Sequence, residues 1–207
     1  MIGYLTIAKR VLGEYEEKKS RFIAEIFPVE SEEEAVKRLS EIKKLHFSAR
    51  HSVYAFRLVS GIERQSDDGE PSGTGGKPLM EILNGLGLQN VMIVVTRYFG
   101  GVLLGTGGLK RAYAAAALNA AEKIEVVRQS VAVKSHIKIP YSFYNRAEII
   151  FSEKGAEVLE KTFGEDVEII LVAPKEIDEE LFLELKELLS GAEICSKKEE
   201  ILYFFKK

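Results

Sequence analysis

The sequence predicts an α+β protein made of two domains, residues 1–128 and residues 129–207. The first part mixes strand and helix patterns around two glycine-rich loops, and the second follows the order strand, helix, strand, strand, helix, strand. The charge balance changes at the same place. Residues 1–128 contain 18 Lys and Arg against 16 Asp and Glu, whereas residues 129–207 contain 11 against 16. A chain of 207 residues is long enough for two small domains.

The composition restricts the class of protein. With 46% hydrophobic and 29% charged residues, it is typical of soluble globular proteins. No segment approaches the ~18 consecutive apolar residues of a membrane-spanning helix, and the first residues lack the pattern of a signal peptide. A single cysteine, Cys195, excludes an internal disulfide and fits a reducing compartment. We therefore expect a cytoplasmic protein without membrane contact.

The first part of the chain opens with β-forming segments and then changes to a helical pattern. Pro28 ends the third of these segments. Ser31 then precedes three glutamates in a capping box, and apolar residues at helical spacing follow. Two further strands are expected, joined by a turn at Ser60-Gly61. The expected strands are Tyr4–Lys9, Val11–Glu17, Arg21–Val29, Val53–Val59 and Ile62–Ser66, and the expected helix is residues 32–45.

Two glycine-rich loops follow, and each leads into a helix. Residues 67–76 contain four glycines and one proline, which excludes regular structure, and Lys77–Leu86 is predicted as a short helix. Asn90–Tyr98 contains the run Val-Met-Ile-Val-Val, which is suited to a strand buried on both faces. The second loop, Gly100–Gly108, opens the longest helix pattern, whose alanines let the helix lie close to a sheet.

The second part of the chain has the βαββαβ order of the ferredoxin-like split βαβ arrangement. Gly164 marks the turn between its two central strands, and Pro174 precedes its second helix. The expected elements are strand Val131–Ile139, helix Ser142–Glu153, strands Ala156–Thr162 and Val167–Val172, helix Ile177–Leu189 and strand Ile194–Phe205.

Neither glycine-rich loop matches an ordinary nucleotide-binding motif. Around Gly76-Lys77, Pro71 stands where the P-loop needs its first glycine, and Pro78 stands where it needs a hydroxyl. The dinucleotide motif G-x-G-x-x-G fails at both loops, because Pro78 or Lys110 replaces its last glycine. We therefore predict no cofactor.

A physical argument still favours an anion at the second loop. Gly100–Gly108 leads directly into a helix N-terminus, where free N–H groups and the macrodipole attract negative charge. Thr106 is expected to cap the helix, with Lys110 and Arg111 in its first turn. These cations oppose the dipole unless an anion lies between them and the loop. The alternative is that the glycines serve close packing and the cations face solvent.

The acidic residues and the histidines suggest two further kinds of site, a metal site and an acid–base site, with less support than the anion site. Asp67, Asp68 and Glu70 could bind a hard cation together with His46 and His51, but acidic turns are more often solvated, and the calcium-loop spacing is not matched. We predict no metal site. The two histidines could serve acid–base chemistry, although a structural role is commoner.

Several segments together resemble the Impact/YigZ family. The stretch Asp67–Pro78, with the sequence DDGEPSGTGGKP, is similar to its most characteristic motif, and Arg97–Leu109, RYFGGVLLGTGGL, is similar to its second. Supporting matches are the segment KSRFIA from Lys19 and the segments Ala49–His51 and Tyr54–Arg57. The resemblance covers residues 18–126, and the βαββαβ pattern is similar to the second domain of bacterial members.

This resemblance implies a ribosomal protein S5 domain 2-like first domain and a second domain like the ferredoxin-fold domain V of elongation factor G. Elongation factor G carries related folds in the same order as its domains IV and V, which act on the ribosome. Eukaryotic relatives regulate translation by blocking activation of the general-control stress kinase. They use an additional domain that this chain lacks, so that role is not carried over.

Two functions of different classes follow. The first is a non-enzymatic RNA- or ribosome-binding protein with a translation-related regulatory role, in which Tyr98 and Phe99 stack on an unpaired base and the acidic second domain meets a protein partner. The second is an enzyme for a small phosphorylated or anionic substrate, with Asp68 or Glu70 as base and His51 as acid. Binding is favoured, because no nucleophile or metal constellation is recognisable. The expected nucleic-acid- or anion-binding residues are Lys19, Arg21, Arg50, Arg57, Lys77, Arg97, Tyr98, Gly107, Gly108, Lys110 and Arg111.

Overall fold

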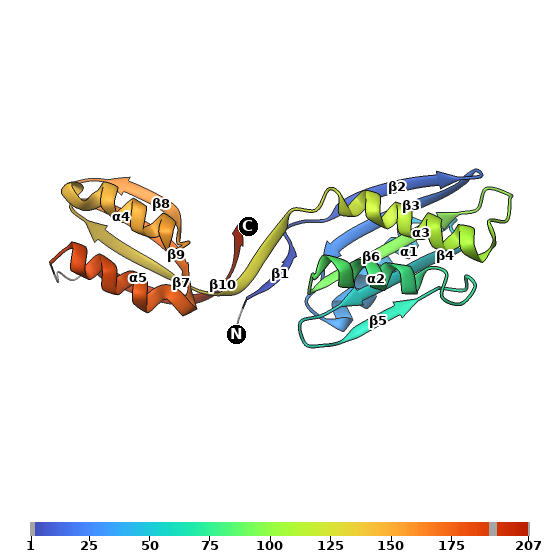
Figure 1. Ribbon diagram of the computed structural model, residues 1–207, viewed down its shortest axis with the longest axis horizontal. Coiled ribbons are helices and arrows are strands. Elements are labelled where there is room, and N and C mark those ends of the chain that lie inside the picture. Colours follow the sequence, from blue (N-terminus) through green and yellow to red (C-terminus); the bar gives the residue numbers. More distant parts are fainter. Residues whose placement is uncertain (1–2, 191–193, 207) are drawn as a thin grey trace. The chain divides into compact units, whose positions relative to one another are not determined.

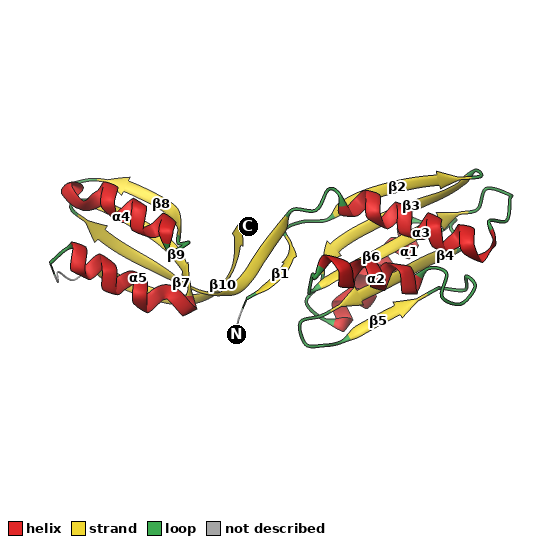
Figure 2. Cartoon of the chain, in the orientation of Figure 1, coloured by secondary structure: helices red, strands yellow, loops and turns green. Residues whose placement is uncertain are grey.

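The structure is a computed structural model that describes residues 3–190 and 194–206, with the backbone alone for residues 195, 196 and 206. The chain divides into two compact units. The N-terminal unit comprises Tyr4–Val127, and the C-terminal unit comprises Arg128–Lys206 together with Gly3. Strands and helices are mixed in both units, so the protein is of the α+β class (Figure 2). Within the described residues, no helix has the length and apolar character needed to cross a membrane.

The N-terminal unit is an antiparallel sheet with helices on both faces (Figure 1). Its strands follow the order β2-β3-β6-β4-β5, so β6 is central. The helices α2 and α3 cover one face, and α1 covers the other. Its elements are β1 (Tyr4–Ile7), β2 (Val11–Glu17), β3 (Ser20–Pro28), α1 (Glu32–Leu45), β4 (His51–Arg57), β5 (Glu63–Ser66), α2 (Gly76–Leu86), β6 (Val91–Tyr98) and α3 (Gly105–Ala121).

The position of β6 at the centre of the sheet, with helices on both faces, accounts for its run of apolar residues. Val91, Ile93 and Val95 pack against α2 and α3, while Met92 and Val94 pack toward α1, so the apolar run is buried on both faces as predicted. This alternation continues beyond the apolar run, because side chains of a strand point to opposite faces in turn. It therefore decides which side of the sheet each polar residue at the end of β6 occupies.

The helices begin and pack as their sequences require. The predicted helix α1 is confirmed, and the Ser31 hydroxyl accepts a hydrogen bond from the Glu34 N–H at 3.1 Å. The alanines of α3 lie against β2 so closely that a Cβ added to Gly13 would stand 2.3 Å from the Ala120 nitrogen. Glycine at position 13 is therefore needed for this close approach.

The C-terminal unit has strands and helices in the predicted order. In its sheet β7 pairs with β9 and also with β10, β8 pairs with β9, and β9 is antiparallel to both β7 and β8. The helices α4 and α5 pack on the same face of the sheet around the cluster that includes Phe151 and Leu181. The strand expected to begin at Val131 begins five residues earlier. The elements are β7 (Val126–Ile139), α4 (Tyr141–Glu153), β8 (Glu157–Phe163), β9 (Val167–Pro174), α5 (Lys175–Leu188) and β10 (Cys195–Lys206).

Candidate functional site

The two glycine-rich loops meet at one edge of the N-terminal sheet. Strand β4 begins at His51 and is antiparallel to β6, so that His51 lies opposite Arg97 near the end of β6. A cavity of about 490 Å³ opens at this edge. Its polar lining consists of Arg50, His51, Glu70, Arg97 and Thr106, and its apolar lining of Pro71, Phe99, Leu103, Leu104 and Leu109, with the backbone of Gly105.

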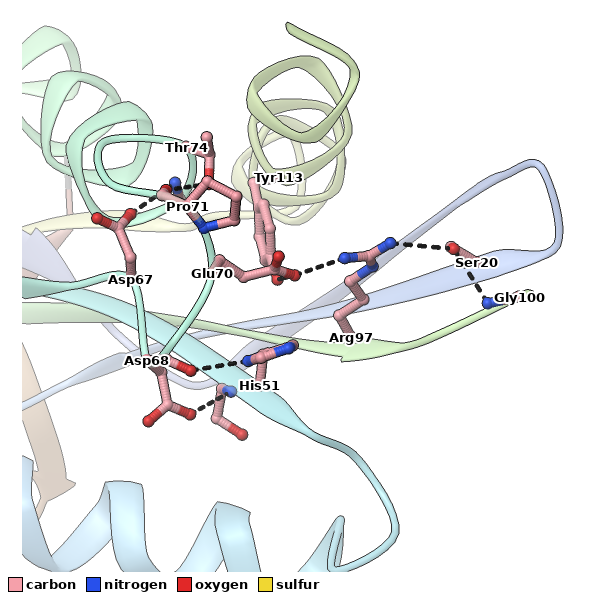
Figure 3. A network of polar contacts seen from close by, with 12 residues as sticks. Ser20, His51, Asp67, Asp68, Glu70, Pro71, Thr74, Arg97, Gly100 and Tyr113 are labelled. Carbon is pink, nitrogen blue, oxygen red and sulfur yellow. Dashed lines mark hydrogen bonds and ion pairs between the residues drawn. The ribbon is translucent and has the colours of Figure 1, made fainter. Parts of the chain in front are cut away.

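A buried ion pair joins the first loop to the end of β6, just before the second loop. The Arg97 guanidinium donates to the Glu70 carboxylate at 2.7 Å, and the two side chains are only 7% and 4% exposed. The Tyr113 hydroxyl donates to the same carboxylate oxygen at 2.8 Å. Figure 3 shows Glu70 between Tyr113 and Arg97. Hydrogen bonds between an arginine and a carboxylate are stronger than neutral ones, so these contacts fix the Glu70 side chain in place.

The environment of Tyr113 keeps its hydroxyl protonated. Burial, followed by the negative charge of Glu70, raises the pKa of Tyr113 well above its ordinary value of 10.0. A protonated hydroxyl can donate to Glu70 but cannot take a proton from a ligand. Tyr113 is therefore a fixed donor in the wall of the site.

Arg97 and Ser20 also connect the second loop to the turn between β2 and β3. The Ser20 hydroxyl accepts a hydrogen bond from the Gly100 N–H at 3.1 Å and lies 3.5 Å from Arg97 Nη2 (Figure 3). A Cβ added to Gly100 would stand 2.0 Å from the Lys19 carbonyl carbon. Glycine at position 100 thus has a packing reason, whatever the loop binds.

The first loop is organised by Asp67. Its carboxylate accepts hydrogen bonds from the N–H groups of Gly73, Gly75 and Gly76 at 2.7, 2.8 and 2.9 Å. Burial opposes ionisation of Asp67, but these backbone hydrogen bonds and one from Thr74 together outweigh it and lower its pKa. Because Gly76 begins α2, the carboxylate occupies the N-terminus of that helix.

Asp68 is held by different partners and orients His51. Its carboxylate accepts from the Ser52 N–H at 2.7 Å and from Lys43 Nζ at 2.7 Å. Its backbone carbonyl lies 2.8 Å from His51 Nδ1 (Figure 3). A carbonyl oxygen can only accept a hydrogen bond, so the hydrogen lies on Nδ1. The second ring nitrogen, Nε2, is then the one that can contact a ligand.

The start of α3 differs from the prediction. The helix begins at Gly105, inside the glycine run, and Leu104 is its N-cap residue, with no side-chain cap. The expected Thr106 cap is therefore wrong. Lys110 and Arg111 were expected in the first turn but lie in the second. Arg111 nevertheless reaches back, because a Cβ added to Gly107 would stand 3.6 Å from its Nη1.

The predicted cations divide into three groups. Arg50 and Arg97 line the cavity. A second group is exposed and does not line the cavity: Lys19 lies in the turn between β2 and β3, Lys77 in the first turn of α2, and Lys110 and Arg111 in the second turn of α3. The two loop glycines, Gly107 and Gly108, lie in the first turn of α3. Arg21 and Arg57 are engaged elsewhere. Arg21 pairs with Glu14 on β2, and Arg57, at the far end of β4, pairs with Glu63 at 3.0 Å.

The two aromatic residues expected to act together lie on different faces. Tyr98 is on the α1 side, where its hydroxyl lies 2.8 Å from His46 Nδ1. Phe99 lines the cavity, is 49% exposed and carries the Arg97 guanidinium 5.5 Å from its ring centre. The structure therefore places Phe99, and not Tyr98, at the cavity.

Sequence reasoning did not select Ser20, Pro71, Leu103, Leu104 or Tyr113 as site residues. The leucines resemble core residues, yet Leu103 is 83% exposed. Tyr113 fitted the apolar stripe of α3, and nothing in its spacing indicated that its hydroxyl reaches Glu70. Among the described residues, no three or more His, Cys, Asp or Glu side chains form a group that could hold a metal ion.

Comparisons with known proteins point to one family. Residues 18–121 match the Impact N-terminal domain. The IMPACT family member YvyE of Bacillus subtilis (strain 168) is 36% identical over 168 residues, which cover 80% of this chain and 77% of the relative. An IMPACT family member of Haemophilus influenzae is 35% identical over 197 residues, which cover 92% and 95%. A crystal structure of a protein described as hypothetical aligns with a TM-score of 0.63 and 27% identity over 100% of this chain and 98% of its own.

Proposed function

The chain belongs to the Impact family, as its N-terminal domain and its relatives show, and on that premise we propose that it is a non-enzymatic RNA- or ribosome-binding protein with a role in regulating translation. The observation that carries the proposal is the cavity between the two signature loops. It combines an exposed cation, an exposed aromatic ring and the start of a long helix, which are the groups that bind an unpaired nucleic-acid strand.

The charges around the cavity favour a polyanion. Arg97 and Glu70 neutralise each other, whereas Arg50 has no carboxylate within ion-pair distance among the described residues. Lys77, Lys110 and Arg111 add exposed positive charge beside the loops. Exposed cations around a helix N-terminus are suited to phosphate groups.

The topology adds support from fold analogy, which is a weaker argument. The pairing of β7 with both β9 and β10, the antiparallel pairing of β8 with β9, and the two helices on one face support a ferredoxin-like fold for the C-terminal unit. We therefore propose that the C-terminal unit corresponds to domain V of elongation factor G and that the N-terminal unit is S5 domain 2-like. The excess of acidic residues in 129–207 suits a basic protein partner for the C-terminal unit.

The contacts of the carboxylates support binding over proton transfer. Glu70 accepts from Arg97 and Tyr113, and Asp68 accepts from Lys43 and the Ser52 N–H. Both carboxylates therefore already accept hydrogen bonds from donors within the protein, as structural carboxylates do. An enzymatic role for Asp68, Glu70 and His51 remains the second candidate because Glu70 and His51 both line the cavity.

The test is a titration of the purified protein with a fluorescent 12-nucleotide single-stranded RNA over a salt series. We expect the affinity to fall with salt, since phosphate contacts release counterions. The double variant Lys110→Glu/Arg111→Glu should lose at least tenfold in affinity. The matched control is Lys37→Glu/Lys44→Glu, which changes the net charge equally on α1, on the other face of the sheet.

Each outcome decides the proposal. Loss of binding in the α3 variant but not in the α1 variant supports an RNA surface at the second loop. Equal losses in both variants would indicate diffuse attraction to the whole unit and would contradict the proposed site. Absence of salt-dependent binding by the wild type, tested also with ribosomal RNA fragments, would refute the RNA-binding proposal.

A further inference from the structure

We propose that the cavity at the start of α3 holds a single unpaired nucleotide, with its phosphate between Arg50 and the first turn of α3 and its base against Phe99. This inference rests on the proposed function and specifies the ligand of the same site. It makes the cavity a nucleotide pocket within a larger phosphate-binding surface.

The size and lining of the cavity define the shape of the ligand. A volume of about 490 Å³ lies within the range of ~300–1,000 Å³ that is usual for small-molecule sites. Phe99, Leu103 and Leu104 form an apolar wall, while Arg50 and Thr106 supply donors. A ligand that fits both parts has a flat apolar body and an anionic end, as a nucleotide does.

The position of the phosphate follows from the unbalanced charge. Within the cavity the charge of Arg97 is matched by Glu70, but Arg50 remains unmatched among the described residues. Within the described part of the chain, the buried Arg97 Nε also has no hydrogen-bond partner, so the wall keeps a donor that is not satisfied by the protein. The first turn of α3 has no side-chain cap, and its N–H groups add to the attraction of an anion.

The position of the base follows from the exposure of the apolar wall. Phe99 is 49% exposed although Arg97 stacks on its ring, and Leu103 is 83% exposed. An aromatic ring that is already held in place loses little conformational freedom when a base stacks on it. His51 adds a contact for a sugar hydroxyl or a base amino group, because its Nδ1 hydrogen is directed to Asp68 and its Nε2 can accept.

The experiment follows the backbone amide signals of the full ¹⁵N-labelled chain by NMR during titration with AMP, adenosine or inorganic phosphate. We expect AMP to shift the signals of Gly105, Thr106 and Gly107 and to bind at least tenfold more tightly than adenosine or phosphate. Phe99→Ser should weaken AMP binding at least fivefold. The matched control is Phe47→Ser, whose side chain is 86% exposed at the end of α1.

A second variant tests the pocket at a position where a substitution should not unfold the protein. Leu103→Ser alters a side chain that is 83% exposed, so the fold should survive, and AMP binding should still fall at least threefold. Phosphate binding as tightly as AMP would reduce the site to a simple anion site and overturn the inference.

Two further outcomes distinguish failure of the nucleotide pocket from failure of the proposed RNA-binding function. If RNA binds in a manner that depends on Lys110 and Arg111 but AMP does not shift the cavity signals, the nucleotide pocket is refuted and the RNA surface stands. If AMP binds in the cavity but RNA does not bind, the cavity binds a free nucleotide and not a nucleotide of an RNA strand. The RNA-binding proposal is then refuted as well.

Discussion

The two glycine-rich loops of the N-terminal unit are similar in composition, but they differ in what binds the N–H groups at the start of the helix that follows each loop. In the first loop, the Asp67 carboxylate binds the N–H groups of Gly75 and Gly76 and so occupies the N-terminus of α2. In the second loop, the N-cap residue of α3 is Leu104, whose side chain cannot accept a hydrogen bond. Each helix N-terminus attracts an anion, but among the residues that the structure describes, a carboxylate is bound at the start of α2 and not at the start of α3.

This difference shows that a glycine-rich composition does not by itself indicate a ligand. Residues 67–76 fold around an internal carboxylate, and glycine is the residue that lets the backbone approach it. Gly100 is explained by the backbone of the neighbouring turn. What distinguishes the second loop is the exposed Phe99 and Leu103 together with the uncapped helix.

The largest effect is expected at the buried ion pair that joins the first loop to the end of β6. Arg97→Met would leave the Glu70 carboxylate buried without its cation, and we expect a loss of about 3–5 kcal/mol in the free energy of unfolding of the N-terminal unit. The double variant Glu70→Met/Arg97→Met should lose less than the sum of the two single variants, because it buries no unpaired charge. Urea denaturation followed by circular dichroism measures these differences.

A matched exposed pair provides the control for this prediction. Arg64 and Glu32 lie 3.2 Å apart in the same unit, with side chains 54% and 38% exposed. Arg64→Met should cost less than about 1 kcal/mol. Equal costs for the two pairs would mean that the burial of the Arg97–Glu70 pair makes no difference to the stability of the unit.

The next effect concerns the internal anion of the first loop. Asp67→Asn replaces one acceptor oxygen by an NH₂ group, and we expect a loss of about 2–3 kcal/mol at pH 7. Because the folded protein lowers the pKa of Asp67, its contribution is complete above the ordinary value of 3.8 and is lost as the pH falls through the lower folded pKa. The stability difference between wild type and variant should therefore narrow below pH 3.8.

The control is Glu81→Gln, which removes an exposed negative charge from α2. We expect a change within about 0.5 kcal/mol. A stability difference for Asp67→Asn that stays constant down to pH 2 would show that the ionised carboxylate is not what holds the first loop.

Much of the fold could be predicted from local patterns, since each depends on near neighbours in the chain. The capping box predicted the start of α1, and the apolar run of β6 predicted a central strand. The start of α3 could not be predicted in this way, because glycine has a low helix propensity and Gly105–Gly108 therefore resembled a loop. Tertiary packing overcomes that propensity, as the buried Gly108 and Leu109 indicate.

The site could be predicted only in outline. Sequence reasoning selected both loops and Arg50, Arg97 and Glu70, but the Arg97–Glu70 pair joins positions 27 residues apart and leaves no periodic signal. The separation of Tyr98 from Phe99 could have been predicted, since the alternation of side chains in β6, which ends at Tyr98, continues one residue farther. The exposure of Leu103 could not, because it depends on how the loop crosses the sheet edge.

The smallest effect on stability gives the sharpest test of the difference between the loops. Gly107→Glu places a carboxylate in the first turn of α3 and so gives the second loop the internal anion that the first loop has. The position accepts a side chain, because an added Cβ would meet Arg111 Nη1 at 3.6 Å, an ordinary contact distance. Helix propensity and the macrodipole should together stabilise the protein by about 1 kcal/mol.

The same substitution should weaken RNA binding at least tenfold, because the new carboxylate competes with phosphate at the helix start. Gly107→Gln adds a side chain of the same size without the charge and should change the RNA affinity less than threefold. Gly107→Ala should also change the RNA affinity less than threefold. Equal losses for Gln and Glu would point to steric exclusion. No loss with Glu would place the RNA elsewhere and remove the functional difference between the two loops. Because stability rises while affinity falls in the expected case, reduced binding could not be attributed to unfolding, and the charge at the start of α3 would be the cause.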